Sequence, residues 1–114
     1  MAFDAREGRR IGSVLVVELS GRLVFGDGEQ KLNDVLQPLI TRGERALLLD
    51  FSDVSAIDSE GIKALFRNMT SLQTRGGSLK LVNLQPRVRL VLEATRLLSV
   101  IETFDDQETA VSSF

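Results

Sequence analysis

The sequence predicts an α/β fold in which a mixed β-sheet of four or five strands carries about four α-helices. Two observations support this class. Short segments rich in Val, Leu and Ile alternate with longer segments whose apolar residues recur at helical spacing, in the order β, β, α, β, α, β, α, β, α. The unbroken apolar run of residues 46–49 is typical of a strand that helices cover on both faces, and strand–helix–strand units make parallel neighbours.

The composition is that of a single soluble globular domain covering residues 1–114. Apolar residues make up 43% of the chain and charged residues 26%, and the net charge of -2 comes without the clustered basic face that nucleic-acid binding requires. The longest apolar runs are too short to cross a membrane, and the N-terminal residues lack a signal sequence. We therefore expect a cytoplasmic protein with no membrane insertion and no direct contact with nucleic acid.

The residue types that the chain lacks exclude several kinds of catalytic and metal site. The chain has no Cys, His, Trp or Tyr. Thiol catalysis, Ser-His-Asp chemistry, and metal sites or proton shuttles built on imidazole are therefore excluded. Because a binding protein needs none of these groups, we expect a binding module and not an enzyme, with no cofactor and no metal.

Two strands are expected before the first helix. Residues 3–11 predict a short edge strand, which is free to pair with a second copy, so a monomer or a weak homodimer is expected. Residues 14–19 are rich in β-branched Val and predict a central strand that ends at Ser20 and Gly21. Residues 22–25 are either a bulged continuation of this strand or the start of the connection.

The first helix begins with residues that resemble a capping box, in which Asp27 accepts a hydrogen bond from the backbone and Gln30 reaches back. Pro38 lies inside the apolar pattern and removes an internal hydrogen bond, so we expect a bend or an early end near Gln37. The helix stops by Gly43 in any case. Its apolar seam consists of Leu32, Val35, Leu36, Leu39 and Ile40.

The rest of the chain repeats the alternation of strand and helix. Glycines after residue 75 end one helix, and Pro86 suits the first turn of the next. The acidic stretch that begins at residue 105 favours the start of a terminal helix. The expected elements are strands at residues 45–51, 78–83 and 100–104, and helices at residues 62–74, from 86 to 98, and after 105.

One stretch, residues 47–66, organises the chain as a buried strand, a connecting loop and then a helix. Asp58 and Ser59 lie where the helix should start, and either can serve as its N-cap. A serine beside a helix N-terminus is well placed to carry an anionic group, since the free N–H groups and the dipole favour negative charge there. Ser59 is thus the candidate switch, although the same pair is also typical of a plain helix cap. The apolar face predicted for this helix consists of Ile62, Leu65, Phe66, Met69 and Leu72.

Three aspartates raise the question of a metal site. Asp50, Asp53 and Asp58 surround the predicted loop, and carboxylates at the carboxyl end of a strand suit Mg²⁺. A phospho-accepting aspartate domain would also need an acidic pair at the end of the first strand and a lysine after the last, and the chain offers neither clearly. We therefore predict no metal site and interpret Asp53 as a turn residue.

The aromatic residues and glycines are assigned to structure and not to a ligand. Phe25, Phe51 and Phe66 are predicted core residues, since large apolar side chains are most often buried. The spacing of the glycines matches neither a phosphate-binding loop nor a dinucleotide fingerprint, so no nucleotide cofactor is expected.

Residues 49–62 read LDFSDVSAIDSEGI, which resembles the signature of STAS domains, the anti-sigma factor antagonist family. Three further stretches resemble the family. Residues 20–23 look like its Gly-x-Leu turn after the second strand, residues 76–83 like its fourth strand with a glycine lead-in, and residues 87–93 like its third helix. The resemblance covers almost the whole chain and implies a single STAS-like domain.

The resemblance also implies a non-enzymatic regulator of bacterial transcription. In the family, the serine after the signature aspartate is phosphorylated by a partner serine kinase that doubles as an anti-sigma factor, and a PP2C-type phosphatase reverses the modification. That serine corresponds to Ser59. The unmodified protein would bind the kinase and free a sigma factor, and a phosphate would disfavour this docking. The implied partner-binding residues are Asp58, Ser59, Glu60, Gly61, Ile62 and Lys63.

The chain departs from the family pattern at three positions. Glu60 replaces the usual second Ser or Thr, Lys63 replaces a small residue, and Val24 stands where many members have an aspartate. Two alternatives therefore stay open. One is a STAS module that is never phosphorylated and acts as a scaffold or as an accessory part of a transporter. The other is a small enzyme or metal-dependent phospho-acceptor that uses Asp50 and Asp58.

Overall fold

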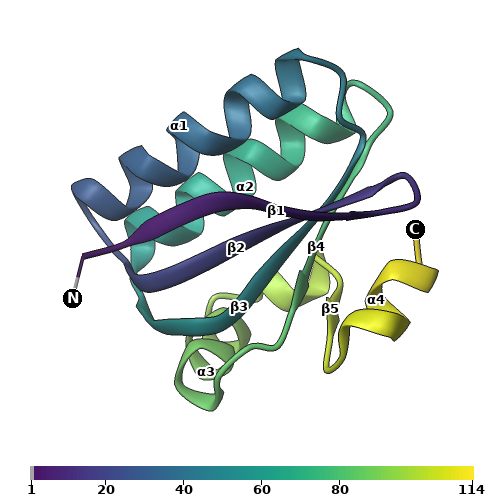
Figure 1. The fold of residues 1–114 in the computed structure, drawn as a ribbon. Helices are drawn as coiled ribbons and strands as arrows, with labels where there is room; N and C mark the ends of the chain where they lie inside the picture. Colours follow the sequence, from purple (N-terminus) through teal and green to yellow (C-terminus); the bar gives the residue numbers. More distant parts are fainter. Residues whose placement is uncertain (1) are drawn as a thin grey trace.

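The computed structural model describes residues 2–114, which form a five-stranded mixed sheet with four α-helices, in the predicted order (Figure 1). The strands lie across the sheet in chain order, with β1 antiparallel to β2 and the other neighbours parallel. The strands are β1 (Asp4–Ile11), β2 (Val14–Leu23), β3 (Ala46–Ile57), β4 (Ser78–Val82) and β5 (Thr103–Phe104). The helices are α1 (Asp27–Thr41), α2 (Ser59–Gln73), α3 (Pro86–Ala94) and α4 (Gln107–Ser112), with a 3₁₀ turn at Leu97–Ser99.

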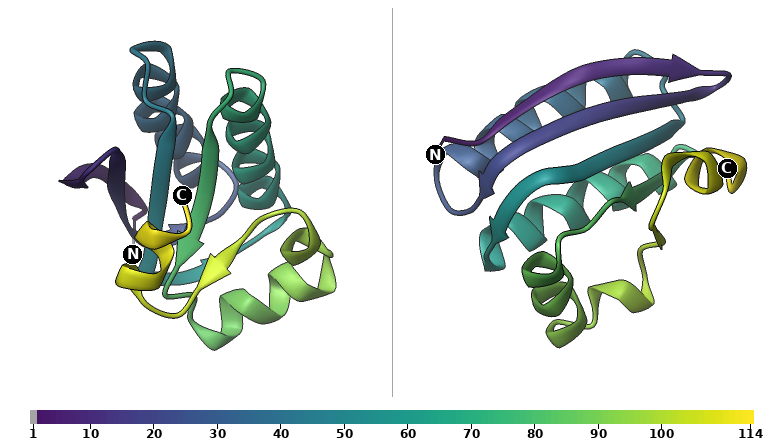
Figure 2. Two further views of the ribbon diagram at one scale, coloured as in Figure 1. Left: turned by 90° about the vertical axis from the view of Figure 1, so that its right-hand side faces the viewer. Right: turned by 60° about the horizontal axis from the view of Figure 1, so that its bottom comes forward.

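Helices cover the two faces of the sheet unequally. The long helices α1 and α2 lie side by side on one face, and the short α4 packs on the other (Figures 1 and 2). The helix α3 contributes to the same core as α1 and α2 and packs against β3. Among the described residues, the helices are all too short or too polar to span a lipid bilayer.

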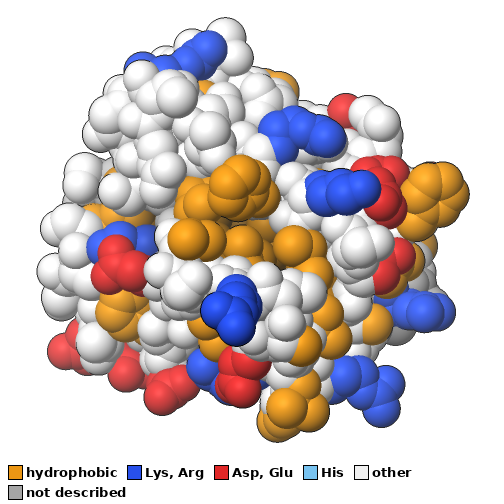
Figure 3. All heavy atoms as spheres, turned by 180° about the vertical axis from the view of Figure 1, so that it is seen from behind, with side chains coloured by type: hydrophobic (Ala, Val, Ile, Leu, Met, Phe, Trp, Pro, Cys, Tyr) orange, Lys and Arg blue, Asp and Glu red, His pale blue; other side chains and the backbone are white. Residues whose placement is uncertain are grey.

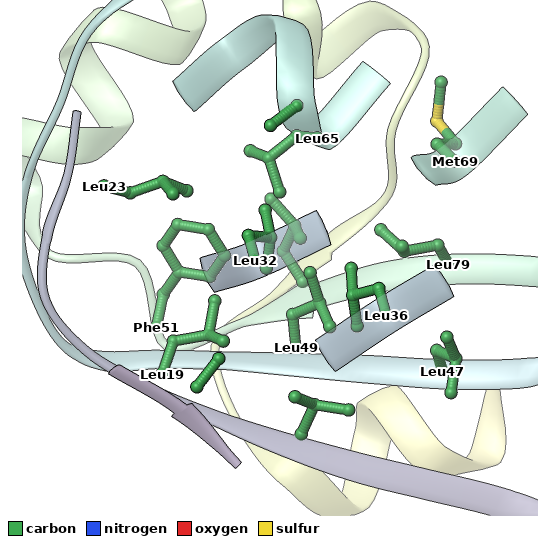
Figure 4. Close-up of a cluster of buried hydrophobic side chains, with 14 of the residues drawn as sticks. Leu19, Leu23, Leu32, Leu36, Leu47, Leu49, Phe51, Leu65, Met69 and Leu79 are labelled. Carbon is green, nitrogen blue, oxygen red and sulfur yellow. The ribbon is translucent and has the colours of Figure 1, made fainter. Parts of the chain in front are cut away.

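The apolar run of β3 is buried on both faces of the sheet, as predicted. Leu47 and Leu49 point into the main core beneath α1 and α2, together with Phe51 (Figure 4). Leu48 belongs to a second cluster beneath α4. All four side chains are fully buried. Because successive strand residues face opposite sides, a strand that is covered on both sides shows no polar alternation.

The strand β3 is longer than the sequence predicted. The prediction ended it at Phe51 and placed a loop after it, but the chain stays paired with β2 as far as Ile57, which lies opposite Leu23. Within residues 52–57, Val54 and Ile57 are buried and the polar residues are exposed. The composition of this segment is typical of a turn, but the segment forms a strand. The interpretation of Asp53 as a turn residue is therefore wrong, because it lies in β3.

Two features of α1 differ from the prediction. Gly26, with φ 90°, is the N-cap, and Glu29 Oε1 accepts a hydrogen bond from its N–H at 3.4 Å, so the box predicted from Asp27 and Gln30 lies one residue too late. Pro38 does not end the helix, which continues for three more residues. Pro38 is exposed, so water can reach the carbonyl that loses its helical partner.

The C-terminal elements are shorter than predicted. The helix α3 ends at Ala94, four residues early, because Arg96 adopts a left-handed backbone with φ 62° that a right-handed helix does not accommodate. The strand β5 keeps only the last two residues of its predicted range. The helix α4 follows the acidic stretch as predicted, and the Asp106 carboxylate caps it by accepting a hydrogen bond from the N–H of Thr109 at 2.8 Å.

Candidate functional site

A single residue, Asp58, joins β3 to α2. Its backbone is extended, with φ -125° and ψ -173°, and its N–H donates a hydrogen bond to the carbonyl oxygen of Leu23 at 3.3 Å. Ser59 is the first helical residue and is exposed to solvent. Of the two N-caps that the sequence allowed, the structure uses Asp58 and leaves Ser59 beside it on the surface.

The Asp58 carboxylate is held by three backbone donors. Its Oδ1 accepts hydrogen bonds from the N–H groups of Glu60 and Gly61, both at 3.0 Å, and its Oδ2 accepts one from the N–H of Phe25 at 3.0 Å. Burial raises the pKa of this carboxyl, but the hydrogen bonds from Phe25, Gly61 and Glu60 together outweigh burial and hold the pKa below its ordinary value. Asp58 is thus a fixed anion that ties the β2–α1 connection to the first turn of α2.

Gly61 lets the first turn of α2 pack directly on the end of β2. A methyl group at this position would lie 2.2 Å from the backbone oxygen of Leu23 and 2.9 Å from Cγ1 of Ile57. Side chains do not approach backbone atoms so closely, so only glycine fits here. This close packing sets where Ser59 lies relative to the β2–α1 connection.

An exposed face runs along α2 from Ser59. Ile62, Lys63 and Phe66 follow at intervals of three, four and seven residues, which places them on the same side of the helix. Lys63 is exposed, Ile62 is partly buried and Phe66 is 49% exposed. Phe25, whose backbone binds the N-cap of α2, is 73% exposed. The residues that we call the Ser59 face are Phe25, Ser59, Ile62, Lys63 and Phe66.

The prediction that Phe25 and Phe66 are core residues is wrong, whereas Phe51 is buried as predicted. The side of α2 that faces the sheet includes small and polar residues, so it differs from the predicted apolar face, which contained Ile62 and Phe66. On the side of the molecule where α2 and α3 lie, hydrophobic side chains gather near the middle of the surface (Figure 3). The buried residues of α2 are Gly61, Ala64, Leu65, Asn68, Met69 and Leu72.

Of the six residues predicted to bind a partner, four present their side chains to solvent. Ser59 and Lys63 are exposed, and Glu60 and Ile62 are partly exposed. The other two build the start of the helix: the partly buried Asp58 carboxylate accepts the cap hydrogen bonds, and Gly61 is buried against the end of β2. Lys63 Nζ lies 3.2 Å from Glu60 Oε2, so these two side chains form an ion pair on the first turn of α2.

Two of the three aspartates of the predicted loop are engaged in local hydrogen bonds, and the third is exposed. Asp50 Oδ1 accepts hydrogen bonds from the N–H of Ser52 at 2.9 Å and from Nδ2 of Asn83 at 3.4 Å. Asp53 is exposed on β3, and Asp58 caps α2. Across residues 2–114, no three acidic side chains are grouped so that they can hold a metal ion.

Comparison with known sequences gives a match over most of the chain. The family model of the STAS domain matches residues 5–110. BtrV of Bordetella bronchiseptica, a proposed anti-sigma factor antagonist, is 30% identical to this chain over 105 residues, which are 92% of this chain and 90% of BtrV.

Solved structures share the fold. A proposed anti-sigma factor antagonist from Thermotoga maritima has a TM-score of 0.85 at 22% identity, over 92% of this chain and 90% of that one. The Bacillus cell fate determinant SpoIIAA, in its phosphorylated form, has a TM-score of 0.72 at 20% identity, over 96% and 97% of the two chains. The match to the family model spans nearly the whole fold, from β1 into α4. The chain therefore belongs to the STAS domain family, and its relatives in sequence are named as anti-sigma factor antagonists.

Proposed function

We propose that this protein is an anti-sigma factor antagonist that is switched by phosphorylation of Ser59. In the unmodified state, the Ser59 face binds an anti-sigma factor that is also a serine kinase, and a sigma factor is released. The kinase phosphorylates Ser59, and a PP2C-type phosphatase restores the unmodified protein. In this scheme the protein is a binding partner and a kinase substrate, and it catalyses no reaction itself.

The observation that carries the proposal is the exposed Ser59 at the first position of α2. A kinase needs an accessible hydroxyl group in a defined place. The hydrogen bonds of Asp58 hold the helix start against the β2–α1 connection, and the close contact at Gly61 holds it against β2. Both contacts favour a Ser59 that is accessible and fixed in position.

Two exposed aromatic rings give the Ser59 face its hydrophobic contact surface. Phe25 and Phe66 are 73% and 49% exposed, and Ile62 is partly exposed between Ser59 and Phe66 on the helix. Large apolar side chains grouped on a surface are typical of protein contact sites. A phosphate on Ser59 adds about -1.5 to -2 charges to this surface. The cost of desolvating that charge and its repulsion from Glu60 both weaken docking.

The proposal is tested by incubating the protein with ATP and the serine kinase anti-sigma factor of the same host. Intact-mass spectrometry should find one phosphoryl group on the wild type and none on Ser59→Ala, which should still bind the kinase. By calorimetry, Ser59→Asp should bind the kinase at least about tenfold more weakly, which corresponds to about 1.4 kcal/mol. Wild-type affinity for Ser59→Asp would refute the switch.

A matched pair of variants tests the docking surface. Phe66→Ala should weaken kinase binding by about tenfold or more, because truncating a large aromatic at a contact site typically costs more than about 1 kcal/mol. Leu90→Ala on α3 removes another exposed apolar side chain, 66% exposed, and should leave the affinity unchanged. A protein that binds a partner but carries no phosphate in its own host would instead favour the scaffold or transporter-accessory role.

A further inference from the structure

We propose that Lys63 is the charge partner of a phosphoryl group on Ser59, and that phosphorylation transfers Lys63 from Glu60 to the phosphate. This inference rests on the proposed phosphorylation of Ser59 and concerns how this particular chain stabilises the modified state. It gives a role to Glu60 and Lys63, the two helix positions at which the sequence departs from the STAS pattern.

Three of the first four N–H groups of α2 are already engaged and are not free to bind the phosphate. Anions at helix N-termini are normally bound by the first backbone N–H groups. Here Asp58 Oδ1 already accepts hydrogen bonds from the N–H groups of Glu60 and Gly61, and the N–H of Ile62 makes the first helical bond to the Asp58 carbonyl at 3.0 Å. Apart from the N–H of Ser59 itself, a phosphate on this residue therefore needs a donor from outside the helix terminus.

Lys63 is the cation of α2 that lies within reach. It follows Ser59 by four residues, so the two side chains project from the same side of the helix, and an acidic group four residues before a lysine is the favourable order. The Lys63 side chain is 66% exposed and its Nζ pairs with Glu60 Oε2 at 3.2 Å. The next cation of this helix, Arg67, starts about 12 Å further along the axis than Ser59, because each residue rises about 1.5 Å.

A phosphate is a stronger partner for Lys63 than the Glu60 carboxylate. The phosphate carries about -1.5 to -2 charges and three acceptor oxygens, against one charge and two oxygens for the carboxylate. Lys63 is largely exposed in its present pair, so moving its ammonium group requires little change in solvation. The Asp58 carboxylate is turned toward its three backbone donors, and in the structure Lys63 pairs with Glu60.

The exchange changes where the negative charge lies on the docking surface and leaves its sum unchanged. Before modification, the charges of Asp58, Glu60 and Lys63 sum to about -1, and Glu60 is neutralised by its pair. After modification the sum is about -3, since the phosphate adds up to about -2. Glu60 is then an unpaired anion at the edge of the docking surface. Its repulsion adds to that of the phosphate and disfavours the partner that bound the unmodified protein.

Phosphoserine introduced at position 59 by genetic encoding tests the exchange without a kinase. The second acid dissociation constant of the phosphate, measured by ³¹P NMR against pH, should be about twofold higher with Lys63 than in Lys63→Met, because a nearby ammonium favours the dianion. Lys63→Arg should keep the wild-type constant. Arg67→Met removes the more distant cation of the same helix and is the matched control that should also leave the constant unchanged.

The side-chain ¹⁵N resonance of Lys63 gives a second readout. It should follow the phosphate titration in the phosphorylated protein and stay constant over the same pH range in the unmodified one. Equal dissociation constants for wild type and Lys63→Met would overturn the exchange. That result would leave the proposed function standing, because the function fails only if the kinase does not modify Ser59 or if the phosphate does not weaken binding.

Discussion

The backbone N–H of Phe25 donates a hydrogen bond to Asp58 Oδ2 at 3.0 Å, so two residues that are 33 positions apart in the chain meet at one carboxylate. The other oxygen of this carboxylate caps α2. Asp58 therefore fixes the β2–α1 connection against the helix start and holds the backbone of Phe25 beside the residue that precedes Ser59. The capping residue of α2 is also the residue that assembles the Ser59 face.

Replacing Asp58 by Ala should destabilise the protein by about 1 to 2 kcal/mol, which is the usual cost of losing an N-cap. The hydrogen bond from the N–H of Phe25 is exposed, so water can replace it in the variant. Its loss therefore adds less to the destabilisation than the loss of the cap bonds. Urea unfolding followed by circular dichroism measures the change. Asp58→Asn keeps one oxygen that can accept the cap bonds, so its free energy of unfolding should fall by less than that of Asp58→Ala. Equal stability of Asp58→Ala and the wild type would show that the cap bonds contribute nothing.

The depressed pKa of Asp58 predicts a contribution to stability that acid removes. In the unfolded chain the pKa of this carboxyl is about 4, which is higher than its pKa in the folded protein. At a pH between the folded and the unfolded pKa, the unfolded chain binds more protons, so stability rises with pH. The contribution is fully present above the unfolded pKa and is lost as the pH falls through the lower folded pKa. The stability difference between wild type and Asp58→Asn should therefore shrink in acid. A difference that is constant with pH would contradict the shifted pKa.

Local rules explain what could be predicted from the sequence. The order of strands and helices follows from hydrophobic periodicity, and Leu47, Leu48 and Leu49 predict a strand that is buried on both faces because each position needs an apolar side chain. The place of Ser59 follows from the preference of short polar residues for helix starts. Each of these signals lies within a few residues of the feature it predicts.

Long-range contacts explain what could not be predicted. Residues 52–57 have the composition of a loop, and they form a strand because β2 pairs with them and their apolar members enter the core. The exposure of Phe66 depends on the small residues Gly61 and Ala64, which turn a different side of α2 toward the sheet. The position of Phe25 depends on Asp58, far away in the chain. The exposure of the two aromatic rings therefore could not be predicted, whereas the position of Ser59 at the start of a helix could.

Gly61→Ala should destabilise the protein by about 2 kcal/mol or more. The added methyl group would lie 2.2 Å from the Leu23 carbonyl oxygen, so the first turn of α2 has to move away from β2, which costs as much as overpacking a core. Chemical denaturation measures the loss. Ser59→Ala changes an exposed position on the same turn and is the control, expected within about 0.5 kcal/mol of the wild type. If the two variants were equally stable, the helix start would not be closely packed.

The ammonium group of Lys80 binds the C-terminal end of α4. The side chain is only 7% exposed, and its Nζ donates hydrogen bonds to the carbonyl oxygen of Ser113 at 2.8 Å and to its Oγ at 3.0 Å. Glu102 Oε1 lies 3.3 Å from the same nitrogen, and the centre of the Phe114 ring lies 4.7 Å from it, which is within the range of a cation–π contact. These contacts join β4 to the end of the chain just beyond α4.

Lys80→Met should loosen α4 while leaving the rest of the fold in place. Methionine keeps an apolar stem but leaves the Ser113 carbonyl without its buried donor, at a cost of about 1 to 3 kcal/mol. Amide hydrogen exchange in residues 110–114 should therefore accelerate by about tenfold or more, while amides in α2 stay protected. Lys63→Met removes an exposed ammonium group and is the control, which should change the exchange rates neither in residues 110–114 nor in α2. Wild-type exchange in Lys80→Met would mean that apolar contacts such as those of Ala110 hold α4 on the sheet without help from the ammonium group.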